Sequence, residues 1–139
     1  MPKNRIIVDT HYLIWDLQGH PNFNHRIQSL YADKENDLYI CTISYWEIAM
    51  LVGKNRIKIN QSVEVVCKDM QAYRNYKTLD ISPQIAGKVA KYAHLINGDP
   101  ADRIIAATAM VEGAKLLTRD QNLISLPFVD TITQSSILI

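Results

Sequence analysis

Short apolar runs alternate along the chain with longer stretches in which apolar residues recur every three or four positions. Short runs are typical of buried strands, whereas the longer spacing is typical of helices with one buried face. The pattern predicts strands at residues 6–8, 38–41, 115–118 and 128–129, and a short extended segment at 79–81. It predicts helices over residues 11–17, 24–32, 44–53, 63–76, 83–96 and 100–112. Because strands and helices alternate, we expect an α/β fold in which helices cover both faces of a short parallel sheet.

Residues at the expected helix ends support these bounds. Ser82-Pro83 and Asp99-Pro100 each place a capping side chain before a proline that suits the first helical position. Ser44 and Glu47 have the S-x-x-E spacing of a capping box, in which each side chain would satisfy a free backbone N–H group. Gly113 is a natural end for the helix over 100–112.

The composition fits one domain with a buried core. The chain has 139 residues, of which 47% are hydrophobic, so we expect a single domain over residues 1–139. No apolar run is long enough to span a bilayer, and the apolar segment after the basic N-terminus is too short for a secretion signal. We therefore expect a cytoplasmic protein without membrane contacts. Cys41 and Cys67 lack the spacing of a zinc site or a disulfide framework, which predicts reduced core residues.

Charge and aromatic content identify no partner by themselves. The formal net charge of +1 does not require a nucleic acid. Trp15, Trp46 and the tyrosines are scattered along the chain, and we interpret them as core and interface residues rather than as a platform for stacking bases. The basic loop at residues 54–58 is either a solvated turn or a contact for phosphate groups, and both interpretations stay open.

Four carboxylates are placed to meet at one edge of the expected sheet. Asp9 and Asp120 follow predicted strands, whereas Glu47 and Asp102 stand in the first turns of predicted helices. In open parallel sheets, ligand sites form at the carboxyl ends of the strands, where the following helices begin. Each acid also has a structural explanation as a cap or turn residue. We nevertheless expect the four acids to converge, with Asp99 nearby.

Such a cluster would require a cation, because close carboxylates repel and raise each other's pKa. Mg²⁺ and Mn²⁺ prefer oxygen ligands, so either ion would relieve the repulsion. A site of this kind suits phosphodiester hydrolysis, in which the ion orients water and offsets charge on the phosphate. The four histidines lack metal-ligand spacing and are expected at the surface or in loops.

The chain resembles the PIN-domain family, and more narrowly the VapC-type toxin ribonucleases of prokaryotic toxin–antitoxin pairs. The resemblance rests on four motifs in order: Val8-Asp9-Thr10-His11 with Leu13 and Trp15, Ser44-x-Trp46-Glu47-Ile48, Asp99-Pro100-x-Asp102-Arg103 leading into Ile105–Ala109, and Leu117-Thr118-Arg119-Asp120. It covers residues 6–129. It implies a three-layer, Rossmann-like α/β/α fold and a Mg²⁺- or Mn²⁺-dependent endoribonuclease. It also implies an RNA substrate, a homodimer, and inhibition by a small cognate antitoxin.

The resemblance assigns roles to individual residues. Asp9, Glu47 and Asp102 match the core acids of the family and Asp120 matches its more variable fourth acid, which together would hold the metal. Asp99 matches an accessory carboxylate of the family. The hydroxyl residues Thr10, Ser44 and Thr118 match small residues that line the pocket. Arg103 and Arg119 match arginines that would face substrate phosphates or pair with the acids. Ala101 departs from the family, whose members often carry Phe at this position.

Two alternatives to a nuclease have different requirements. A non-catalytic RNA- or protein-binding module on the same fold would retain RNA without cutting it and would tolerate changes to the acids. A phosphohydrolase acting on small phosphates would often carry a D-x-D motif after the first strand. Asp9-Thr10-His11 does not supply that motif.

Overall fold

A sheet of five parallel strands forms the centre of the structure, a computed structural model that describes residues 3–96 and 98–137. The strand order is β3-β2-β1-β4-β5. The strands are β1 (Asn4–Val8), β2 (Asn36–Cys41), β3 (Lys77–Leu79), β4 (Lys115–Leu117) and β5 (Thr131–Ile132). In the described residues, the helices are α1 (Thr10–Gln18), α2 (His25–Ala32), α3 (Ile43–Gly53), α4 (Val63–Arg74), α5 (Pro83–Tyr92), α6 (Pro100–Glu112) and α7 (Gln121–Ile124), followed by the 3₁₀ turn η1 (Gln134–Ser136).

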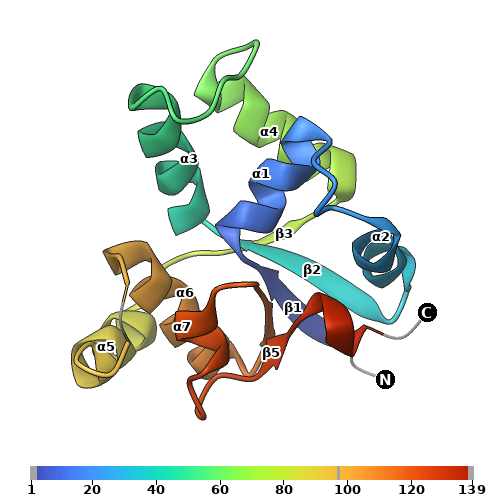
Figure 1. Cartoon of the computed structure of the whole chain (residues 1–139). Helices are drawn as coiled ribbons and strands as arrows, with labels where there is room; N and C mark the ends of the chain where they lie inside the picture. The colour runs from blue at the N-terminus through green and yellow to red at the C-terminus, as the bar shows by residue number, and fades with distance from the viewer. Residues whose placement is uncertain (1–2, 97, 138–139) are drawn as a thin grey trace.

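The sheet separates two hydrophobic cores. Helices α1 to α4 cover one face, whereas α6 and α7 cover the other and α5 packs on α6 (Figure 1). The central strand β1 serves both cores, because Ile6 and Val8 point to the first and Ile7 points to the second. All three side chains are buried, as expected for a parallel strand with helices on both sides. The structure confirms the predicted three-layer α/β/α architecture.

The end of the chain differs from the sequence prediction. The last strand, β5, begins at Thr131 rather than at residue 128, and it pairs with β4 through Thr131 and Leu116. Val129 instead closes a turn, since its backbone N–H donates to the carbonyl of Leu126 at 3.3 Å. Its side chain is buried in the core of α6 and α7. Val129 is thus buried by packing rather than by strand pairing, and Phe128 is partly buried against the same core.

Two helices end earlier than predicted. Helix α4 stops at Arg74 because Asn75 adopts a left-handed conformation with φ of 55°, and β3 then begins at Lys77. Helix α5 stops at Tyr92, and a turn leads to Ile96. Ile96 is still buried, so the apolar spacing continues after the helical backbone has ended.

No helix in the described part of the chain combines the length and apolar character that crossing a bilayer would require. Cys41 and Cys67 are free and buried, as their spacing predicts. They belong to opposite cores, Cys67 on the α1 to α4 side and Cys41 on the α6 side.

A bidentate ion pair joins the ends of α1 and α4. Arg74 donates from Nε to Asp16 Oδ2 at 2.9 Å and from a terminal nitrogen to Asp16 Oδ1 at 2.6 Å. The Asp16 side chain is only 11% exposed, so water offers it little alternative solvation. The Arg74 guanidinium also lies over the Phe23 ring, 5.0 Å from its centroid. The pair therefore anchors α4 to the α1 layer.

We predict that Arg74→Met lowers the free energy of unfolding by about 2 kcal/mol, because hydrogen bonds to a charged, largely buried partner are lost. Lys68→Met is the matched control on the same helix. Its ion pair with Glu64 joins side chains that are 75% and 77% exposed, and such pairs contribute less than about 1 kcal/mol. Denaturant unfolding of both variants measures the difference. Equal losses would show that the Asp16–Arg74 pair has no special role.

Candidate active site

The first acid of the site is buried at the end of the central strand. Asp9 follows β1 directly and is 3% exposed. Its backbone N–H donates to the carbonyl of Leu117 at 3.0 Å, which continues the pairing of β1 with β4. The Thr118 hydroxyl donates to Asp9 Oδ2 at 2.7 Å. Asp9 is the N-cap residue of α1, but its side chain makes no capping hydrogen bond, so the carboxylate is directed elsewhere.

A chain of hydroxyl groups holds the second acid. Helix α3 begins at Ile43, with Thr42 as its N-cap, so Ser44 and Glu47 already lie inside the helix. The predicted capping box is therefore wrong. Thr10 donates its hydroxyl proton to Glu47 Oε1, and Ser44 Oγ lies 2.7 Å from Thr10 Oγ1. Because the single Thr10 proton points to Glu47, the buried Ser44 hydroxyl donates to Thr10.

The N-terminus of α6 brings two further acids to Glu47. Asp99 caps the helix, and its Oδ1 accepts from the Asp102 backbone N–H at 3.0 Å. Glu47, Asp99 and Asp102 each offer one carboxylate oxygen, and these atoms lie within 4.8 Å of one another. Gly98, with φ of +114°, lies directly behind Asp102, and a Cβ atom there would stand 2.7 Å from Asp102 Oδ2. A glycine is required for both the backbone conformation and the space.

The charges of all the predicted acids act on Asp102. The pKa of Asp102 is raised to about 8, chiefly by burial and then by the carboxylates of Asp99, Asp9, Asp120 and Glu47, in that order. An acid with this pKa is largely protonated at neutral pH in the metal-free protein. The four carboxylates therefore influence the ionisation of Asp102 even where their oxygens are not in direct contact with it.

The other two core acids are also harder to ionise than usual. Burial raises the pKa of Glu47 to about 6, against the hydrogen bond from Thr10, which lowers it. Burial likewise raises the pKa of Asp9, against the hydrogen bond from Thr118. The hydroxyl groups thus favour the ionised forms that burial disfavours.

Asp120 stands apart from the three closest acids. It caps the short helix α7, where its Oδ1 accepts from the Asn122 backbone N–H at 2.8 Å. Its own N–H donates to Thr118 Oγ1 at 3.0 Å, and the same hydroxyl donates to Asp9. Thr118 therefore connects Asp120 to Asp9. The sequence pattern places Asp120 at a strand end among the four acids but does not predict α7, the helix that it caps.

The two predicted substrate-binding arginines, Arg103 and Arg119, make different contacts. Arg103 is half-buried, and its Nε donates to the carbonyl of Ile96 at 3.2 Å, which ties α6 to the segment before it. Arg119 is exposed, and its guanidinium carbon lies 5.6 Å from the centroid of the Trp15 ring. Within residues 3–96 and 98–137, neither forms an ion pair with these acids.

His11 is the residue that the sequence interpretation missed at this site. It is exposed at the start of α1, and it lines two cavities. One cavity of about 340 Å³ is formed by Asp9, His11, Trp15, Arg119 and Asp120. The other, of about 390 Å³, includes Glu47 and Asp99 together with Trp46, Lys54 and Arg56. The position of His11, two residues after Asp9 at a strand end, is the signal that could have placed it here.

The donor set fits a hard divalent cation. The converging ligand atoms are carboxylate oxygens, which Mg²⁺ and Mn²⁺ prefer. Burial, and after it the neighbouring carboxylates, raises the pKa values of Glu47 and Asp102, so a bound cation would favour their ionised forms. Lys54 and Arg56 line the cavity that contains Glu47, so the basic loop is available to phosphate groups beside the acids. The arrangement can therefore combine a cation with a polyanionic substrate.

Comparisons with known proteins agree with this fold. A model of the PIN domain family matches residues 6–129. Ribonuclease VapC22 of Mycobacterium tuberculosis is 29% identical over 118 residues, which cover 85% of this chain and 88% of that protein. A chain of the VapBC2 complex from Rickettsia felis, solved with a promoter DNA fragment, superposes with a TM-score of 0.72 at 15% identity, covering 93% of this chain and 98% of that one. A toxin–antitoxin complex from Klebsiella pneumoniae gives a TM-score of 0.67 at 22% identity, with 93% and 97% covered.

We predict that metal-free wild-type protein loses stability relative to Asp102→Asn as the pH rises. The folded-state pKa of Asp102 is about 8 and its ordinary value is 3.8, so the folded chain binds more protons than the unfolded chain between these values. Folded-state stability then falls as pH rises through this window. Thermal unfolding in EDTA at about pH 5 and about pH 8 should show a smaller decrease for the variant. Asp69→Asn, exposed on α4, should behave as the wild type. Parallel pH profiles for all three proteins would contradict the assignment.

The hydroxyl chain gives a second prediction. Thr10→Val removes the hydrogen bond that lowers the pKa of Glu47, so we expect Mn²⁺ affinity to fall by about 10- to 100-fold, as for other groups that orient metal ligands. Ser44→Ala keeps the bond from Thr10 to Glu47 and should weaken Mn²⁺ binding much less. Titration calorimetry measures both affinities. If Ser44→Ala weakened Mn²⁺ binding more than Thr10→Val, the order of hydrogen bonds from Ser44 to Thr10 to Glu47 would be refuted.

Proposed function

The chain belongs to the PIN domain family, and on this premise we propose that it is a metal-dependent endoribonuclease that acts as the toxin of a toxin–antitoxin pair. The observation that carries the proposal is the convergence of Glu47, Asp99 and Asp102 beside the buried Asp9, at the carboxyl edge of the sheet. The name of the similar ribonuclease VapC22 supports cleavage of RNA.

We propose that Asp9, Glu47 and Asp102 hold Mg²⁺ or Mn²⁺, directly or through water, and that Asp120 completes the pocket. Asp99 is close enough to Glu47 and Asp102 to share the same ion. When bound, the ion would orient a water molecule, lower the pKa of that water and offset charge on the phosphate. Thr10 and Thr118 fix the orientations of Glu47 and Asp9 before the ion arrives.

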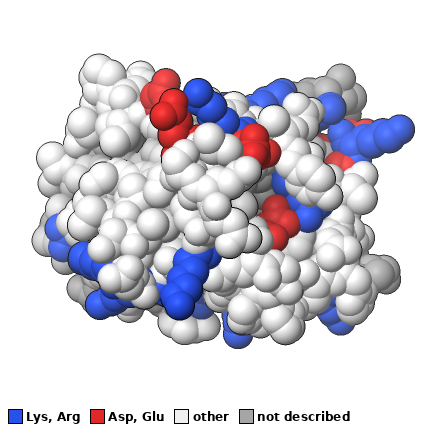
Figure 2. Space-filling view, turned by 90° about the horizontal axis from the view of Figure 1, so that it is seen from above, with Lys and Arg blue, Asp and Glu red and all other residues white. Residues whose placement is uncertain are grey.

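Basic side chains near the acids fit a polyanionic substrate. On the face drawn in Figure 2, most of the surface is uncharged, acidic groups are small and separate, and a larger basic group lies at the lower left. The net charge of the chain is only +1, so general attraction of RNA is weak. Lys54, Arg56 and Arg119 lie on the two cavities that contain the acids, where they can hold the phosphates locally.

We also propose a small antitoxin as protein partner, together with a homodimer and a cytoplasmic location. The similar structures are described as toxin–antitoxin complexes, which supports the first of these. Co-expression with the product of the adjacent reading frame should give a complex with suppressed ribonuclease activity. A chain that is harmless on overexpression and binds no such product would argue against a toxin role.

We predict that Asp102→Asn reduces RNA cleavage at least about 100-fold, because it removes a carboxylate from the metal site. The variant should stay folded, since it relieves repulsion among the acids. Cleavage of RNA in Mg²⁺, compared with the same reaction in EDTA, measures the effect. Asp69→Asn is the control for loss of one negative charge on the exposed surface of α4.

The outcomes separate the candidate functions. Cleavage by Asp102→Asn at the wild-type rate would refute the site. RNA binding by the wild type without cleavage, and without dependence on Mg²⁺, would instead support the non-catalytic binding module.

A further inference from the structure

An aromatic and cationic cavity lies directly beside the acids. It has a volume of about 340 Å³ and shares Asp9 and Asp120 with the proposed metal site. Its other lining residues are His11, Trp15 and Arg119. We propose that this cavity binds one unpaired nucleobase of the RNA, next to the phosphodiester that is cut. The proposal rests on the proposed ribonuclease function and adds a base-binding subsite to it.

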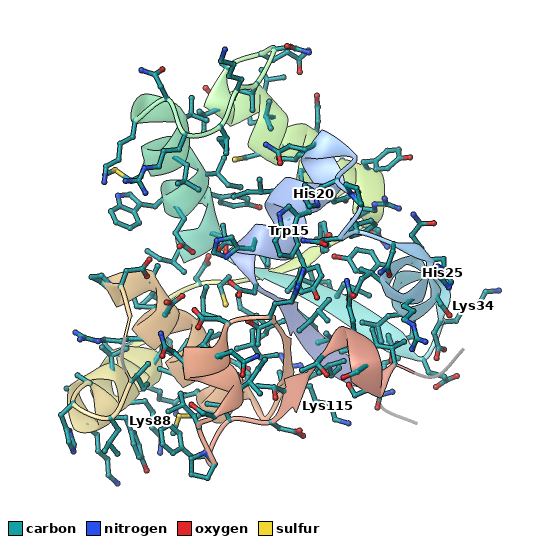
Figure 3. All side chains as sticks on the ribbon, viewed as in Figure 1. Trp15, His20, His25, Lys34, Lys88 and Lys115 are labelled. Carbon is teal, nitrogen blue, oxygen red and sulfur yellow. The ribbon has the colours of Figure 1, made fainter. Side chains whose placement is uncertain are left out.

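The Trp15 ring is held in a fixed orientation. The Tyr12 ring meets it edge-on, with centroids 5.0 Å apart and planes at 86°. The His20 ring is stacked against it at 5.5 Å and 25°, and Figure 3 labels Trp15 and His20 close together at α1. A ring supported in this way loses little conformational freedom when further groups pack over it. Trp15 therefore lines the cavity as well as packing against the core, whereas the sequence interpretation gave it only a core or interface role.

Arg119 completes the stacking surface. Its guanidinium carbon lies 5.6 Å from the Trp15 centroid, and Arg119 is exposed whereas Trp15 is half-buried. A base that enters from solvent therefore meets the planar guanidinium first, with the indole ring behind it. Proteins bind unpaired bases by stacking them on aromatic rings and on arginine planes, and these contacts tolerate all four bases. The positive charge also offsets the repulsion between the acids and the RNA backbone.

The position of the cavity links it to the cleavage step. His11 lines this cavity and also the second cavity, which contains Glu47 with Lys54 and Arg56. An RNA strand that crosses the acids between these cavities has cations on both sides of the metal site. The volume lies near the lower end of the roughly 300–1,000 Å³ range of small-ligand sites, which suits a single base better than a base pair. The base must therefore be unpaired.

The test compares an intact RNA with two RNAs that each lack one base. The cleavage position of the wild-type protein is first located in RNA, and oligonucleotides are made with an abasic ribose on either side of it. We expect one of the abasic substrates to be cut about 5- to 150-fold more slowly than the intact RNA, the effect of losing one stacked base. Trp15→Leu and Arg119→Ala should cut the intact and abasic RNAs at nearly equal rates. Trp15→Phe should restore part of the preference, because it restores a ring.

The controls separate a subsite from general damage. A variant that is merely misfolded cuts both substrates more slowly and keeps their ratio. Trp46→Leu, on the other cavity, should keep the wild-type ratio. Equal cleavage of intact and abasic RNAs by the wild type, or an unchanged ratio in Trp15→Leu, would overturn the subsite while leaving the ribonuclease intact. Absence of any cleavage by the wild type would instead refute the proposed function.

A binding measurement needs no cleavage. The chain has two tryptophans, so Trp46→Leu leaves Trp15 as its only indole fluorophore. In EDTA, hexa-adenylate should quench the Trp15 emission of this variant, and adding Arg119→Ala should weaken the quenching. Emission that hexa-adenylate leaves unchanged, or quenching that is equal with and without Arg119, would overturn the proposal.

Discussion

Repulsion among carboxylates that the fold holds together is the constraint on which this structure depends. The pKa of Asp102 is raised to about 8 because burial and neighbouring acids both oppose its ionisation. A protein that needed only stability would place a neutral or apolar side chain there. The fold instead supports the acids with hydroxyl groups: Thr118 holds Asp9, and Thr10 holds Glu47. The acid cluster lowers the free energy of unfolding, and this loss of stability is the physical reason for assigning the cluster a function.

The parallel sheet determines which residues can take part. β1 is central and paired on both sides, so Asp9 at its end is surrounded by protein on every side except the carboxyl edge. The neighbouring strand β4 ends at the same edge and supplies Thr118. Acids on α3 and α6 reach this edge because both helices pack there and contact each other. Strand pairing thus brings together Asp9 and Thr118, which are 109 positions apart, and helix packing adds the acids of α3 and α6.

Much of the fold and several site residues could be predicted from local sequence. The apolar run before Asp9 predicts a buried strand, and Asp99-Pro100 predicts the start of α6, because both depend on near neighbours. The interpretation of Ser44 and Glu47 as a capping box was wrong because the competing partner, Thr10, is distant in sequence. The place of Trp15 in the cavity could not be predicted either, because its neighbour Arg119 is also distant in sequence. The pairing of β1 with β4 brings the two residues together.

The order of strands has a consequence for synthesis. A ribosome makes β1 first, but one of its two sheet partners, β4, emerges only after residue 115. Until then Asp9 lacks Thr118, and the central strand has an open side. Long-range parallel pairing of this kind forms late and slowly. A chain that stops before β4 therefore lacks both the hydrogen bond from Thr118 to Asp9 and the carboxylate of Asp120, so the ribosome that makes this protein meets the complete set of acids only after residue 120 has been added.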